Sequence, residues 1–270
     1  MSTIFIAVLL LVLLFLTLIY RFRHRHNHVK FLSLEELRDD ARSLVKIPSS
    51  VGYIINSLTV EKKADSYIDS IASLVEYSSA YSIRNIVVYD AKGYFNKLFA
   101  EICTQVKTRM EKDKEFGRYT VVIHSRQGVE QLQPLAVLDS PTKQEVCTVS
   151  VFLTSLHDSY MQLTDNFRTY VRSHVTSGND ETLVPNLQQE NPFDQHTYSF
   201  LLPMHENMKH FPDEIQLVVV FDKAFVLHGF FPYHISNAEI YQFPELSSLK
   251  SSDFSHFMHK YSACEQRRGK

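Results

Sequence analysis

The chain has 270 residues, of which 44% are hydrophobic and 21% are charged, and its formal net charge is −2. This length and composition allow one core of about 220 residues without disulfides. Because 28 basic residues are balanced by 30 acidic ones, the chain lacks the field that binding to nucleic acid requires. Cys103, Cys147 and Cys264 have no zinc-site spacing, so we interpret them as reduced cysteines of a cytosolic protein.

The first predicted element is a membrane anchor. Ile4 to Tyr20 is apolar and uncharged, and as a helix it would cover about 26 Å. Basic residues follow this segment instead of preceding it, which favours an uncleaved anchor over a signal peptide. The positive-inside rule then puts the main domain in the cytosol, with the opposite orientation left open. We therefore divide the chain into an anchor with a basic juxtamembrane segment, residues 1–30, and a single domain, residues 31–270.

The first half of the domain alternates helical and extended patterns. Ser33 to Glu36 forms a capping box, which predicts a helix that runs to about Lys46 and ends ahead of Pro48. The apolar spacing then predicts, in order, strand Val51–Ile55, helix Asp65–Tyr81, strand Ile86–Tyr89, a helix with an apolar stripe from Phe95 to Met110, and strand Tyr119–His124.

The second half continues this alternation and contains one long polar loop. Its predicted elements are strand Val146–Thr154, helix Leu156–Val171, polar surface loop Thr176–Gln195, helix Phe200–Met208, strand Ile215–Phe221 and helix Ser252–Cys264. The unbroken apolar run in strand Ile215–Phe221 is typical of a sheet covered on both faces. We therefore expect an α/β domain with a mostly parallel central sheet surrounded by helices, and ligands beyond the carboxyl ends of the strands.

Few chemically distinctive residues follow the predicted strands. The chain has 7 glycines, and no glycine-rich phosphate loop follows any strand. Asn56, after the first strand, supplies no carboxylate for a magnesium ion. We interpret Asp90 as a helix N-cap. We interpret Asp222 first as a turn residue and only second as a residue of a site. The histidines are scattered without a partnered serine or cysteine, so a catalytic triad is not expected.

The C-terminal sequence carries the strongest functional pattern. Arg267, Arg268, Gly269 and Lys270 stand directly behind the last predicted helix. Two guanidiniums, an ammonium and a glycine whose N–H can approach a ligand closely are suited to phosphate oxygens. Taken alone, these residues leave other interpretations open: a solubilising tail, a complement to the helix dipole, or an arginine-type retrieval signal.

Three segments, Val87–Phe95, Phe230–Ile240 and Tyr261–Lys270, resemble the Nogo-B receptor family, the accessory subunit of dehydrodolichyl diphosphate synthase, a cis-prenyltransferase. The resemblance extends over roughly residues 48–270 and fits the predicted anchor. It implies a cis-prenyltransferase fold that has lost its active site. Active members carry an Asp-Gly-Asn motif after the first strand, near the place of Asn56, and an Arg-x-Ser-Gly-Glu stretch that Phe221–Phe225 does not match.

The resemblance also implies a role for the C-terminus. Arg267 and Gly269 keep the Arg-x-Gly motif of the family, which crosses a dimer interface and helps bind the pyrophosphate of isopentenyl diphosphate in the catalytic partner. Arg268 and Lys270 flank this motif and can add phosphate contacts. No catalytic residue and no metal ligand are then expected in this chain, because the partner supplies the catalytic Asp and the Mg²⁺ site.

The function implied by the resemblance is that of a required, non-catalytic subunit, inactive alone, of a prenyltransferase at the endoplasmic reticulum membrane. The complex would be at least a heterodimer that adds isopentenyl units to make the polyprenyl diphosphate precursor of dolichol for protein glycosylation. The apolar aromatics of Phe230–Ile240 are expected at the dimer interface. The alternative is a single-pass membrane receptor or scaffold with a degenerate cis-prenyltransferase fold.

Overall fold

The computed structural model describes residues 31–114, 116–133, 147–161, 164–165, 168, 206–208 and 210–265. The predicted anchor Ile4–Tyr20 and the polar loop Thr176–Gln195 lie outside these residues. Among the residues that are described, no helix has the length and apolar character needed to cross a membrane.

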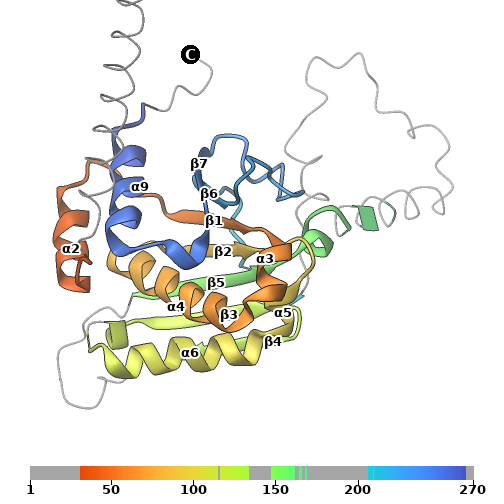
Figure 1. Cartoon of the computed structure of the whole chain (residues 1–270), viewed down its shortest axis with the longest axis horizontal. Coiled ribbons are helices and arrows are strands. Elements are labelled where there is room, and N and C mark those ends of the chain that lie inside the picture. Colours follow the sequence, from red (N-terminus) through yellow and green to blue (C-terminus); the bar gives the residue numbers. More distant parts are fainter. Residues whose placement is uncertain are drawn as a thin grey trace, which may run out of the picture.

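A seven-stranded sheet with the order β4-β3-β5-β2-β1-β6-β7 forms the centre of the domain (Figure 1). All neighbouring strands pair in parallel except β3 and β4, which are antiparallel. The mostly parallel sheet predicted from the sequence is therefore confirmed. The strands are β1 (Ser50–Ile55), β2 (Asn85–Tyr89), β3 (Thr120–Ser125), β4 (Gly128–Leu132), β5 (Thr148–Thr154), β6 (Leu217–Phe221) and β7 (Glu239–Phe243).

The two faces of the sheet border two separate apolar cores. In β1, Tyr53 and Ile55 belong to one core and Ile54 belongs to the other, because successive side chains of a strand point to opposite faces. Val87 and Val88 divide in the same way in β2. Burial on both faces explains why the central strands are continuous apolar runs.

Helices cover the face of the larger core (Figure 1). The capping box at Ser33 is confirmed: its Oγ accepts a hydrogen bond from the Glu36 N–H at 3.2 Å, and the Glu36 carboxylate accepts one from the Ser33 N–H at 2.8 Å. The first helix ends earlier than the predicted Lys46, because Leu44 is extended. The helices that supply residues to this core are α2 (Leu34–Ser43), α4 (Ala64–Ala80), α6 (Phe99–Lys112) and α9 (Ser251–Ala263).

An aromatic cluster packs on the opposite face of the sheet. Phe230 and Phe231 are only 2% and 3% exposed, and both rings pack against Tyr89. These two residues belong to the segment expected at a dimer interface, so its most apolar side chains serve this chain's own core. Tyr233 is the large apolar side chain of that segment that is exposed, at 49%.

Several short elements differ from the prediction. The helix expected from Phe95 to Met110 is divided at Leu98, which ends one helix and begins the next. The helix expected from Leu156 begins as a π-helix over His157–Met161, and its remainder is mostly outside the described residues. The first part of the divided helix is α5 (Tyr94–Lys97), and the helix predicted over Phe200–Met208 is a 3₁₀ turn, Glu206–Met208, in its described residues. Elements that were not predicted are α3 (Ser57–Lys62), β4, β7 and the 3₁₀ turns Phe116–Arg118 and Leu246–Ser248.

Candidate functional site at the carboxyl edge of the sheet

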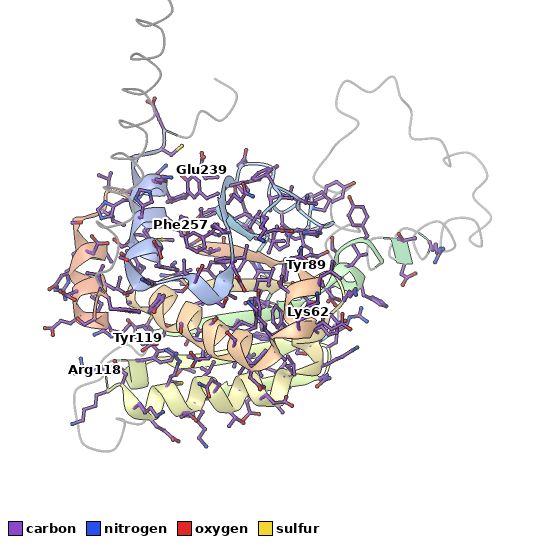
Figure 2. The ribbon with its side chains drawn as sticks, viewed as in Figure 1. Lys62, Tyr89, Arg118, Tyr119, Glu239 and Phe257 are labelled. Carbon is purple, nitrogen blue, oxygen red and sulfur yellow. The ribbon has the colours of Figure 1, made fainter. Side chains whose placement is uncertain are left out.

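The parallel strands end at one edge of the sheet, where ligands of open α/β folds bind. This carboxyl edge lies beside α3 and α5, whereas the last turn of α9 lies toward the other end of the strands (Figure 1). Tyr89 and Lys62 mark the carboxyl edge in Figure 2, and Glu239 lies near the opposite edge. The polar residues that follow the strands are Asn56 after β1, Asp90 after β2, Arg126 after β3, Ser155 after β5 and Asp222 after β6.

Asn56 is held at both ends of its side-chain amide. Its Oδ1 accepts a hydrogen bond from the Leu58 N–H at 3.0 Å and caps α3, which supplies the local reason for an asparagine here. Its Nδ2 donates to Asp222 Oδ2 at 2.8 Å, across the paired strands β1 and β6. A neutral amide therefore occupies the position after the first strand and joins two strand ends.

Asp222 receives a second donor from the histidine that follows it in the same loop. His228 Nε2 lies 3.0 Å from Asp222 Oδ2, and the Ala224 N–H donates to Oδ1 at 3.4 Å. Burial alone would raise the pKa of Asp222, but the hydrogen bonds from His228, Ala224 and Asn56 outweigh it and lower the pKa. The turn interpretation of Asp222 is confirmed, whereas the contact with His228 was missed. The only local sign of this contact in the sequence is the pair His228–Gly229. His228 has a positive φ of 49°, a conformation found mainly in turns.

Asp90 is buried and caps the start of α5. Its Oδ1 accepts from the Tyr94 N–H and its Oδ2 from the Phe95 N–H, both at 3.0 Å, while Ser57 Oγ lies 3.3 Å from Oδ1. Burial raises the pKa of Asp90, and these hydrogen bonds offset only part of that effect. The predicted capping role is therefore confirmed, although the backbone N-cap is Gly93, three residues later, in a left-handed conformation.

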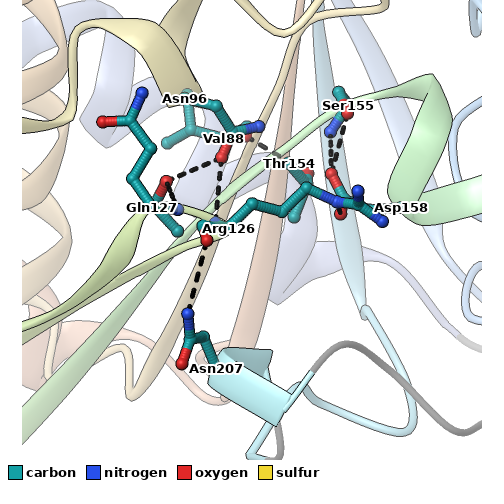
Figure 3. A network of polar contacts seen from close by, with 9 residues as sticks. Val88, Asn96, Arg126, Gln127, Thr154, Ser155, Asp158 and Asn207 are labelled. Atoms are coloured by element: carbon teal, nitrogen blue, oxygen red, sulfur yellow. Dashed lines mark hydrogen bonds and ion pairs between the residues drawn. The ribbon is translucent and has the colours of Figure 1, made fainter.

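Arg126 and Asp158 form an ion pair that joins the ends of β3 and β5 (Figure 3). Arg126 Nε donates to Asp158 Oδ1 at 2.5 Å, and the Asp158 side chain is 1% exposed. The other oxygen of Asp158 accepts from both the N–H and the Oγ of Ser155, each at 2.8 Å. Asn207 donates to the Arg126 carbonyl at 3.4 Å. This network is a cross-link between loops, with its buried carboxylate fully used inside the chain.

The carboxyl edge therefore offers little to a metal ion. Asp90, Asp158 and Asp222 each already accept hydrogen bonds from donors of this chain. Within the described ranges, no group of three or more His, Cys, Asp or Glu side chains could hold a metal ion. A cation bound by Asp222 Oδ2 would compete with both Asn56 and His228 for the same oxygen. These residues do not fit a magnesium ion in the arrangement that they adopt.

The predicted anion-binding residues lie outside the described part of the chain. Arg267, Arg268, Gly269 and Lys270 follow Glu265, the last residue that the structure describes. What the structure places is the point from which they continue, at the end of α9. Cys264 there donates its thiol to Glu239, the first residue of β7, at 2.9 Å. The tail therefore starts at the amino edge of the sheet, opposite the carboxyl ends of the strands.

Comparison with solved structures shows which fold the chain has. Lavandulyl diphosphate synthase from Lavandula x intermedia, solved in complex with dimethylallyl diphosphate, superposes with a TM-score of 0.51 and 12% identity, covering 83% of this chain and 99% of that one. No protein-family model matches the sequence. The chain has the α/β fold of the cis-prenyltransferases, with a mostly parallel central sheet.

Sequence comparison then points to particular relatives. The dehydrodolichyl diphosphate synthase complex subunit Nus1 of Mus musculus is 28% identical over 239 residues, which are 86% of this chain and 69% of that protein. The subunit NUS1 of Homo sapiens is 27% identical over 237 residues, again 86% of this chain and 70% of that protein. The resemblance to the Nogo-B receptor family is thereby confirmed over most of the chain.

Proposed function

We propose that this chain is the accessory subunit of a heteromeric dehydrodolichyl diphosphate synthase. It does not condense prenyl units by itself. A catalytic partner with the same fold supplies the catalytic Asp, the Mg²⁺ and most of the prenyl tunnel. This chain contributes Arg267 and Gly269 to the site in the partner where the pyrophosphate of isopentenyl diphosphate binds. The product is the polyprenyl diphosphate precursor of dolichol, made at the endoplasmic reticulum membrane with the main domain in the cytosol.

The observation that carries this proposal is the amide of Asn56 at the position after β1. The family resemblance expects a carboxylate there in active members. Here the side chain is neutral, and both of its ends are engaged, with Leu58 and with Asp222. The polar groups of the carboxyl edge form hydrogen bonds within this chain. This supports a subunit that relies on another chain for the chemistry.

The origin of the tail supports a role in trans. Arg267 lies three residues beyond Cys264, a stretch that spans about 10 Å when fully extended. Cys264 lies at the amino edge of the sheet, where its thiol donates to Glu239, the first residue of β7. The tail therefore starts at the edge opposite the one where ligands of open α/β folds bind. A phosphate that Arg267 binds belongs more naturally to a neighbouring subunit.

The test is reconstitution of isopentenyl incorporation with the purified subunits, separately and together. We expect no condensation by this chain alone, and a large increase when it joins the catalytic subunit. In the complex, Arg267→Ala should reduce turnover by about one to two decades, the equivalent of one charge-assisted phosphate contact. Condensation by this chain alone would contradict the proposal. Unchanged turnover with Arg267→Ala in an assembled complex would remove the tail from the substrate site.

Protease protection of microsomes tests the membrane topology in the same preparation. Digestion of the domain from the cytosolic side is expected. A protected, lumenal domain would favour a receptor or scaffold with a degenerate cis-prenyltransferase fold. The two experiments are independent, because reconstitution uses purified subunits and does not depend on which side of a membrane the domain occupies.

A further inference from the structure

Three segments that are distant in sequence meet where α9 ends. They are the stretch that leads into β1, the first residue of β7, and the last turn of α9. Ser262 Oγ accepts hydrogen bonds from the backbone N–H groups of Val45 at 3.0 Å and Lys46 at 3.3 Å. We call Lys46, Glu239, Ser262 and Cys264 the exit junction, because the chain continues from it toward Arg267.

Cys264 is held in this junction through its backbone and its side chain. Its N–H donates to the Tyr261 carbonyl at 3.2 Å, and its own carbonyl accepts a hydrogen bond from Lys46 Nζ. Its thiol donates to Glu239 Oε1 at 2.9 Å. That carboxylate raises the pKa of the Cys264 thiol, which keeps the sulfur protonated and able to donate. Three contacts from three different elements therefore fix the direction of the backbone at Cys264.

Aromatic contacts stiffen the surroundings of the junction. The Lys46 ammonium lies 4.8 Å from the centroid of the Tyr261 ring, so this lysine has a second contact on α9. Tyr241 of β7 stacks on Phe257 of α9, with ring centroids 6.3 Å apart. Glu239 and Phe257 lie on the same side of the domain in Figure 2. Strand β7 and α9 consequently hold the two halves of the junction together.

A fixed starting point matters for a short tail that must reach a ligand. Each residue that is ordered only when the ligand binds costs conformational entropy, and preorganisation removes part of that cost. Arg267 is three residues from Cys264, so the direction of the chain at Cys264 limits where its guanidinium can lie. The alternative role of the junction is packing that only holds α9 in place. The two possibilities differ in whether the junction acts through Arg267.

We infer that the exit junction is a positioning device: Lys46, Glu239, Ser262 and Cys264 aim the chain so that Arg267 and Gly269 arrive at the pyrophosphate site of the partner subunit. This inference rests on the proposed function and adds residues to it. These four residues touch neither substrate nor metal, and they act through the tail.

The test uses the reconstituted complex of the full chain with its catalytic partner. Glu239→Ala removes the acceptor for the Cys264 thiol, and Ser262→Ala removes the acceptor for two backbone N–H groups. Each should raise the KM for isopentenyl diphosphate by about three- to tenfold, the effect of ordering one or two more tail residues on binding. The KM for the allylic diphosphate and the yield of complex should not change. Glu239→Gln keeps an oxygen acceptor and should restore the KM to the wild-type value.

A matched control lies just beyond the other end of β7. Glu245 also binds a neighbouring side chain, Lys63, at 2.7 Å, but it follows the end of β7 opposite to Glu239. Glu245→Ala should leave both KM values unchanged. An equal rise in the KM for isopentenyl diphosphate in Glu245→Ala and Glu239→Ala would overturn the inference, because the effect would then come from general loosening of β7.

A double-mutant cycle separates failure of this inference from failure of the proposed function. If the junction acts through the tail, Glu239→Ala should not lower the kcat/KM for isopentenyl diphosphate any further in the Arg267→Ala background. A double variant whose loss of kcat/KM is the product of the two single losses would overturn the positioning role. The role would also be overturned if Arg267→Ala lowered kcat/KM while the junction variants did not. If Arg267→Ala itself has no effect, the role of the tail in the proposed function fails. Melting temperatures of the variants show whether each one folds, and Ser262→Ala keeps the test available if Glu239→Ala does not fold.

Discussion

Carboxylates accept hydrogen bonds at both edges of the sheet, but these bonds have different roles at the two edges. At the carboxyl edge, Asp90, Asp158 and Asp222 accept hydrogen bonds from Ser57, Arg126 and Asn56, and these bonds join neighbouring strand ends. At the amino edge, Glu239 accepts a hydrogen bond from Cys264, and the chain continues from there to a cluster of cations. The edge at which ligands of this fold class are expected is thus internally occupied, while the opposite edge leads to the residues best suited to an anion.

This difference separates the maintenance of the fold from the binding of substrate. Substitutions at the carboxyl edge should change the stability of this chain without changing the turnover of the folded complex. Substitutions at the exit junction should change the KM for isopentenyl diphosphate with little change in stability. The comparison fails if a carboxyl-edge variant folds normally and yet impairs catalysis.

The largest effect on stability is expected from Asp158→Ala. The substitution leaves the Arg126 guanidinium and two donors of Ser155 without their acceptor. Removing one member of a buried ion pair costs about 3–5 kcal/mol, and the low end applies here because the Arg126 side chain is 28% exposed. Urea unfolding of the full chain measures this loss.

The control for Asp158→Ala is Asp39→Ala, which removes an exposed ion pair with Arg42. It should cost less than about 1 kcal/mol. The folded fraction of the Asp158 variant should support normal turnover when combined with the catalytic partner. A turnover that falls further than the folded fraction would make the network around Arg126 part of a functional site.

A smaller loss is expected from Asn56→Asp, which replaces a donor by a second carboxylate beside Asp222. The hydrogen bond of 2.8 Å becomes a repulsive contact and should cost about 1–3 kcal/mol at neutral pH. Protonation of one carboxylate relieves the repulsion, so the loss should shrink on acidification. Chemical unfolding at several pH values measures both effects.

Asn237→Asp is the matched control for that substitution. Asn237 also donates to a carboxylate, that of Glu214 at 3.2 Å, but it is exposed. Its replacement should cost less than Asn56→Asp because solvent screens the two charges. Neither variant should acquire condensing activity alone. Magnesium-dependent activity in the Asn56 variant would mean that a single carboxylate restores the site, and would break the contrast between the two edges.

The sequence was sufficient for the elements that follow from local patterns. Apolar runs located β1, β2 and β6, and the capping box located the start of α2 at Ser33. The cap at Asp90 was also predictable, because its partners Tyr94 and Phe95 are close in sequence. Strand β7 was missed because it is partly exposed and lacks a clear apolar run.

The contacts that define both edges could not be predicted in the same way. Asn56 and Asp222 are 166 positions apart, and Lys46 and Cys264 are 218 positions apart. Such pairs meet only because β1 lies next to β6 and α9 returns to the amino edge. Asn56 and Asp222 are residue types common in turns, and Lys46 and Cys264 belong to no local motif, so the neighbouring sequence does not distinguish any of the four from a solvated side chain. Only the strand order and the direction of α9 bring them together.

The smallest effect concerns acid stability, and it separates two aspartates of the carboxyl edge by sign. Hydrogen bonds lower the pKa of Asp222 despite its burial, so its ionised form stabilises the fold above the unfolded pKa. That contribution is lost as the pH falls through the folded pKa. Burial raises the pKa of Asp90, so its ionised form carries a cost, which protonation removes as the pH falls through its folded pKa.

Unfolding free energies of the full chain between about pH 3 and pH 5.5 test this opposition. The stability difference between wild type and Asp222→Asn should shrink toward acid, by less than about 1 kcal/mol because His228 and Asp222 are partly exposed. The difference between wild type and Asp90→Asn should grow toward acid, since only the wild type gains from protonation. A stability difference that grows toward acid for both aspartates would mean that burial dominates the pKa of each. The Asn56 and His228 contacts would then not hold Asp222 in its ionised form, and the carboxyl edge would not be the closed, internally paired network that distinguishes it from the exit junction.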